Sequence, residues 1–106
     1  MKVLWTKTAE NLLDSIFNFI QVHNIFAAVE IYNNILDESL KLAKFPQLGF
    51  IEPLLLDFSE EYRSLIVHRI YKIVYYIDNQ TKKIYIVAVF DCRQKPKKLQ
   101  EIVRNN

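Results

Sequence analysis

Apolar residues recur at helical spacing in the N-terminal half of the chain, whereas the C-terminal half has long runs of Val, Ile and Tyr. Lys2–Trp5 is short and apolar and reads as a first strand. From Ala9 to Val22 the apolar positions recur every three or four residues, which predicts an amphipathic helix. Thr6 or Thr8 can cap this helix, because a hydroxyl there accepts a hydrogen bond from a free backbone N–H.

A second helix is predicted to start near Ile25, with Asn24 as its N-cap. It must stop before Pro46, since the residue preceding a proline disfavours helical geometry. Two helices joined by so short a link form an antiparallel helical hairpin. A loop follows, in which we expect Gly49 to take a positive φ. The apolar residues between Leu54 and Phe58 show no clear period and predict no element.

Three strands are predicted after this loop, at Tyr62–His68, Ile70–Ile77 and Lys82–Asp91. Their β-branched and aromatic residues fit a pleated sheet better than a helix. The polar residues Asp78–Thr81 are turn-prone and join the last two strands. The order of elements predicts an α+β domain over residues 1–106: an N-terminal strand, a helical hairpin and a three-stranded antiparallel sheet.

A two-residue turn at Asn79–Gln80 would set Ile73 opposite Ile86 and Lys72 opposite Val87. The face expected to pack on the helices then contains Tyr71, Ile73, Tyr75, Ile77, Ile84, Ile86, Ala88 and Phe90. The other face contains Lys72, Val74, Tyr76, Tyr85, Val87, Val89 and Asp91.

This second face is too apolar to lie bare, and an exposed apolar patch of this kind usually marks a partner site. The alternative is that the C-terminal segment or a second copy of the chain covers it. Pro96–Arg104 predicts a short helix in that segment, with Leu99, Ile102 and Val103 on one side. Both alternatives remain open from the residues alone.

Composition excludes several classes of protein. The chain has 106 residues, the length of one domain, and Cys92 is its only cysteine, so no internal disulfide forms. Cys92, His23 and His68 match no zinc spacing, and we expect neither a metal nor another cofactor. Polar residues interrupt the apolar stretch from Leu12 to Val29, so no membrane span is predicted. No signal peptide is evident, which points to the cytoplasm.

The small net charge of +2 conceals an asymmetry between the two halves. Residues 1–62 hold four lysines and nine carboxylates, a net −5, whereas residues 63–106 hold ten cations and three carboxylates, a net +7. A basic C-terminal half suggests an acidic partner, either nucleic acid or protein, although a solvated basic face would look the same.

Three segments carry a family resemblance. Leu42–Gly49 resembles the helix exit of the RelE/ParE superfamily of toxins, from bacterial type II toxin–antitoxin (plasmid stabilisation) systems. Tyr62–Val67 followed by Tyr71–Tyr75 resembles its central strand pair, in which an arginine often stands at Lys72. Val89–Pro96 resembles its last strand and loop, where Arg93 matches a usual arginine. The resemblance covers nearly the whole chain.

The superfamily implies two possible targets. RelE-like members are endoribonucleases that cut messenger RNA on the ribosome, and in that branch Arg63, Lys72 and Arg93 would bind phosphate. Leu65 replaces the second basic residue of the first central strand in that site, and Leu99 stands near the place of its late tyrosine. The proton-transfer groups are thus largely missing, and only His68 is left as a plausible acid or base. ParE-like members are associated with inhibition of DNA gyrase without chemistry of their own. The missing groups favour the ParE-like branch.

Either branch implies a cognate antitoxin that wraps the toxin in a hetero-oligomer. We expect the antitoxin to contact the second sheet face and the tail, at Val74, Tyr76, Tyr85, Val87, Val89 and Leu99. A third hypothesis is a binding module with no toxicity.

Overall fold

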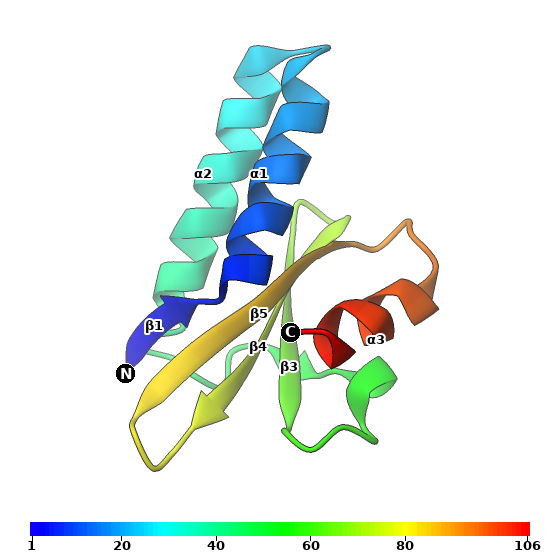
Figure 1. The fold of residues 1–106 in the computed structure, drawn as a ribbon. Helices are drawn as coiled ribbons and strands as arrows, with labels where there is room; N and C mark the ends of the chain where they lie inside the picture. Colours follow the sequence, from blue (N-terminus) through cyan, green and yellow to red (C-terminus); the bar gives the residue numbers. More distant parts are fainter.

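The computed structural model describes residues 1–106 and confirms the α+β class (Figure 1). Its sheet has five strands in the order β1-β5-β4-β3-β2, with β1 parallel to β5 and the other pairs antiparallel. None of its helices is long and apolar enough to cross a membrane. The elements are β1 (Lys2–Trp5), α1 (Lys7–Gln21), α2 (Ile25–Lys41), β2 (Phe50–Ile51), the 3₁₀ turn η1 (Pro53–Leu55), β3 (Tyr62–Val67), β4 (Tyr71–Asp78), β5 (Lys83–Asp91) and α3 (Pro96–Arg104).

The two N-terminal helices start at side-chain caps that the sequence predicts. The Thr6 hydroxyl accepts a hydrogen bond from the Ala9 N–H at 3.2 Å, and the Asn24 amide oxygen accepts one from the Ala27 N–H at 3.1 Å. Each cap satisfies a donor that the first turn of a helix leaves free. The resulting antiparallel hairpin packs its apolar side on one face of the sheet (Figure 1).

The register between β4 and β5 differs from the prediction. Tyr76 lies opposite Tyr85, because the connection is a longer loop in which Lys82 adopts a φ of 57°. Asp78 Oδ1 accepts from the N–H groups of the following residues and holds the loop in place. Further along the pair, Val87 has no partner opposite it, which makes a β-bulge.

The bulge reverses the alternation of side chains along the end of β5. Ala88 and Phe90, expected against the helical hairpin, instead join the core on the other face. Val89, expected on the other face, joins the hairpin-side core together with Ile73 and Tyr75. The predicted faces are therefore wrong for these β5 residues and correct for Ile84 and Ile86, which precede the bulge.

The second face of the sheet is not left open. α3 covers it, and Val74, Val87 and Leu99 are buried together. The spacing of Leu99 and Val103 puts both on the side of α3 that faces the sheet. The expectation that this face is free for a partner is wrong at these positions, and the alternative of covering by the C-terminal segment is confirmed.

The φ of Gly49 is not positive, contrary to the prediction, and a glycine is required there because two segments of the chain approach closely. A Cβ at Gly49 would lie 2.6 Å from the backbone oxygen of Ser64 and 3.0 Å from the Tyr75 ring. The loop before β2 can therefore reach β3 only where a side chain is absent.

Gly49→Ala is expected to destabilise the protein by about 1–3 kcal/mol, the usual cost of an added group that must displace packed neighbours. The obstacle is the backbone of a central region of the sheet, which cannot rotate away. Urea denaturation measures the loss. Gln47→Ala, at an exposed position of the same loop, is the control and should leave the midpoint nearly unchanged. Equal midpoints for both variants would contradict the close approach.

Candidate functional site

Lys72 is buried on the α3 side of the sheet and forms an ion pair with Glu52. Its Nζ donates to Glu52 Oε1, which also accepts from Ser64 Oγ at 2.7 Å. Glu52 Oε2 accepts from the Leu54 N–H at 3.0 Å and so caps η1. Burial acts to raise the pKa of Glu52, but hydrogen bonds from Lys72, the Leu54 N–H and Ser64 outweigh it and lower the pKa below its ordinary value.

Arg63 lies on the opposite face of the sheet from Lys72. It pairs with Tyr75 across β3 and β4, and Tyr75 belongs to the hairpin-side core. One guanidinium nitrogen of Arg63 donates to the Gly49 carbonyl at 2.8 Å, which ties the loop to the sheet. Since opposite faces of a sheet cannot share a ligand, Arg63 and Lys72 do not form one phosphate site.

Arg93 is exposed and holds Asp91 in a two-point contact. Its Nε lies 3.0 Å from Asp91 Oδ1 and a terminal nitrogen lies 2.8 Å from Oδ2. The hydrogen bond from Arg93 lowers the pKa of Asp91, which stays ionised as the partner of this cation. A phosphate at Arg93 would compete with this carboxylate for the guanidinium charge.

His68 lies in the turn between β3 and β4, with a φ of 53°. Its Nε2 makes a short hydrogen bond with the side-chain amide nitrogen of Asn34 on α2. The contact ties the turn to the helical hairpin.

The four residues proposed for RNA cleavage thus serve four separate contacts. Sequence reasoning missed two partners, Glu52 and Asp91. Glu52 was detectable in principle, since it is the one charge inside the apolar run from Phe50 to Leu56. Its partner was not detectable, because nothing local indicates which cation reaches it.

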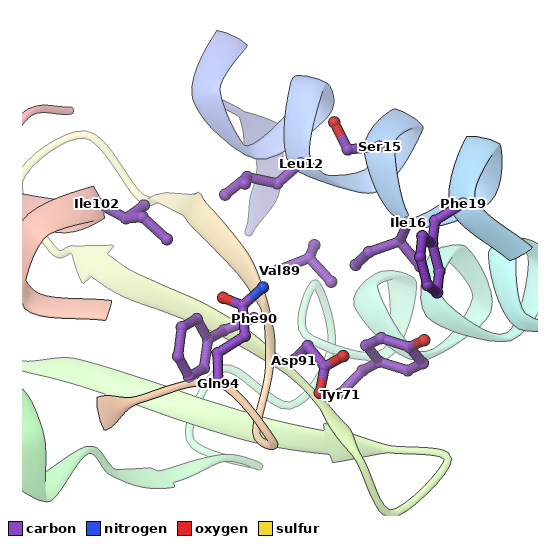
Figure 2. A pocket seen from close by; sticks show the side chains of 10 residues that line it. All are labelled: Leu12, Ser15, Ile16, Phe19, Tyr71, Val89, Phe90, Asp91, Gln94 and Ile102. Carbon is purple, nitrogen blue, oxygen red and sulfur yellow. The ribbon is translucent and has the colours of Figure 1, made fainter. Parts of the chain in front are cut away.

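A pocket of about 270 Å³ opens between α1, the end of β5 and α3 (Figure 2). Its lining is mainly apolar and includes Val89, one of the six residues predicted to contact the antitoxin. Tyr71, Asp91 and Gln94 add polar groups on the side away from α1 (Figure 2). The apolar side chains come from three elements: Leu12, Ile16 and Phe19 from α1, Val89 and Phe90 from β5, and Ile102 from α3.

Tyr76 and Tyr85 form a second partly exposed apolar surface. Their rings stack at 5.3 Å, and Tyr62 and Phe58 continue the row in edge-to-face contacts. Burial raises the pKa of Tyr76. Of the six residues predicted to contact the antitoxin, Tyr76 and Tyr85 are partly exposed and Val89 lines the pocket.

The family model for the ParE toxin of the type II toxin–antitoxin system parDE matches residues 3–96. The chain belongs to the ParE toxin family. This match confirms the resemblance and the branch favoured by the sequence. The fold is also similar to that of a chain from the chromosomal ParDE TA system of P. aeruginosa, with a TM-score of 0.70 and 20% identity over 86% of this chain and 95% of that one. No curated protein matches the chain.

Proposed function

We propose that residues 1–106 act as one toxin domain that inhibits growth in the cytoplasm by binding DNA gyrase, and that a cognate antitoxin neutralises it. The family match over residues 3–96 carries this proposal. The protein is then a binding inhibitor, and its surfaces matter more than any reactive group.

The contacts of the candidate catalytic residues favour binding over RNA cleavage. A metal-free ribonuclease needs cations that meet the phosphate and a group that moves a proton nearby. Here Lys72 is neutralised by Glu52, and Arg93 is held by Asp91. Arg63 lies on the other face, and His68 is bonded to Asn34. Each of these side chains makes contacts within the fold, and they do not converge on one site.

For the antitoxin we propose a contact at the pocket between α1 and α3, extending to Val89, and at the partly exposed pair Tyr76 and Tyr85. A concave apolar pocket with a few polar groups suits the side chains of a docked segment. Val74, Val87 and Leu99 are buried where α3 packs on the sheet, so a docked segment does not reach them while α3 stays in place.

A supercoiling assay tests the target. Purified toxin is expected to block supercoiling of relaxed plasmid by gyrase, and antitoxin added in equal amount should restore it. His68→Ala, which removes only the contact between the β3–β4 turn and Asn34 of α2, is the control and should inhibit as wild type does. Unimpaired supercoiling at saturating toxin would refute the gyrase target.

The same protein in a translating extract separates the alternatives. Message should stay intact, because the cleaving groups are not assembled. Cleavage that His68→Ala abolishes would establish the RelE-like alternative in its place. Normal growth of cells induced to make the chain without antitoxin would leave only the non-toxic binding module.

A further inference from the structure

The tip of the helical hairpin is the most exposed apolar surface of the protein. Phe19 and Val22, at the end of α1, are 71% and 77% exposed, and Phe26, in the first turn of α2, is 85% exposed. Ile25 and Val29 add partly exposed side chains from α2. Figure 1 shows that this end of the hairpin projects beyond the sheet, so no other element of the chain covers it.

The tip also lies in the middle of a charge-free stretch. No Asp, Glu, Lys or Arg occurs between Asp14 and Glu30, although a quarter of all residues are charged. The five apolar side chains together expose on the order of 500 Å², given about 200 Å² for one fully exposed phenylalanine. This approaches the upper end of the largest patch on a typical monomer, about 300–600 Å².

The chemistry of the tip restricts its partner. A surface without cations offers nothing to the phosphates of nucleic acid or to an acidic peptide. A membrane-surface helix carries lysines and arginines on its polar face, which this stretch lacks. What remains is an uncharged, apolar protein surface.

We propose that the tip binds the tip of a second copy of this chain around a two-fold axis. The surface is then its own complement, because an uncharged patch meets an identical patch without setting like charges together. Two such patches bury roughly 1,000 Å² in total, the lower limit for a specific interface. The dimer is therefore weak and depends on concentration. The contact includes Phe19 at the rim of the pocket, whereas the other four apolar side chains of the tip do not line that pocket.

Sedimentation velocity of the purified chain from about 1 µM to about 1 mM tests the proposal over the range expected for a weak interface. The mass should rise from 12.6 kDa towards twice that value. Phe26→Ser should raise the dissociation constant at least about tenfold, since it removes the most exposed anchor from both copies. Phe26 is exposed, so the fold should survive this change.

Leu40→Ser is the matched control: Leu40 is 66% exposed near the other end of α2, and its loss should change the dissociation constant less than about twofold. A monomer mass throughout the range would overturn the proposal. A dimer that Leu40→Ser weakens as much as Phe26→Ser would overturn the placement at the tip.

Cross-linking supplies a second readout. In a Cys92→Ser background, which removes the only cysteine, His23→Cys at the tip should oxidise to a disulfide dimer at least about tenfold faster than Lys44→Cys, in the turn after the other end of α2. Equal rates would exclude tip-to-tip contact. Neither readout depends on gyrase or on an antitoxin, so the dimer and the proposed target can fail independently.

Discussion

Glu52→Ala is expected to destabilise the protein by about 3–5 kcal/mol, because it leaves the Lys72 ammonium buried without a counter-charge. The same carboxylate accepts from Ser64 and from the Leu54 N–H, so three donors lose their acceptor at once. In a chain of this size such a loss is a large share of the total stability, about 5–15 kcal/mol. Thermal unfolding should show it as a drop of about 4–8 °C for each kcal/mol.

A double variant separates the charge from the packing. Glu52→Leu with Lys72→Met replaces both partners by apolar side chains of similar size and should recover most of the stability, since no unpaired charge remains. If the double variant is no more stable than Glu52→Ala, the ion pair is not the reason for the loss. This would also return Lys72 to the list of candidate functional cations.

The Glu52 contacts also give the stability a pH dependence of definite sign. The pKa of Glu52 is lower in the folded chain than in the unfolded chain. Its contribution is therefore complete above the unfolded value, about 4.3, and is lost as the pH falls through the folded value. The difference in free energy of unfolding between wild type and Glu52→Gln should therefore become smaller as the pH falls below about 4.3.

How far the sequence predicts the fold depends on whether the relevant signal is local. Thr6 and Asn24 cap their helices as predicted, because a cap is an interaction between residues three apart. The pairing of β1 with β5 and the addition of β2 were not predicted, since they join distant segments of the chain. The bulge at Val87 was also missed, because alternation alone cannot show where one residue is left unpaired.

The candidate site shows the same division. The resemblance correctly gave the family, but it assigned Lys72 and Arg93 to phosphate without their carboxylate partners. Glu52 precedes Lys72 by 20 residues, and only the folded sheet and η1 bring them together. For the hairpin tip, the sequence shows a stretch without charged residues. Only the folded structure shows that the apolar side chains of this stretch are exposed, because the sheet does not extend to the tip.

Leu99→Asp is expected to detach α3 from the sheet and to destabilise the protein by about 2–5 kcal/mol, as for the loss of a fully buried leucine. Leu99 is completely buried between α3 and the sheet, and a carboxylate there has no partner in the apolar core. A nine-residue helix has little stability of its own, so α3 should unfold when this contact is lost.

Hydrogen exchange and dye binding distinguish detachment of α3 from general unfolding. In Leu99→Asp the backbone amides of α3 should lose protection from exchange, while the amides of α1 stay protected. A hydrophobic dye should bind the newly exposed face around Val74 and Val87. Lys98→Asp introduces the same group at the neighbouring exposed position. It should stabilise α3 slightly, by about 0.3–1 kcal/mol, because an anion replaces a cation in the first turn. If Leu99→Asp and Lys98→Asp show the same exchange and dye binding, the packing of α3 does not depend on Leu99. A partner could then reach the covered face of the sheet without the cost of displacing a packed helix.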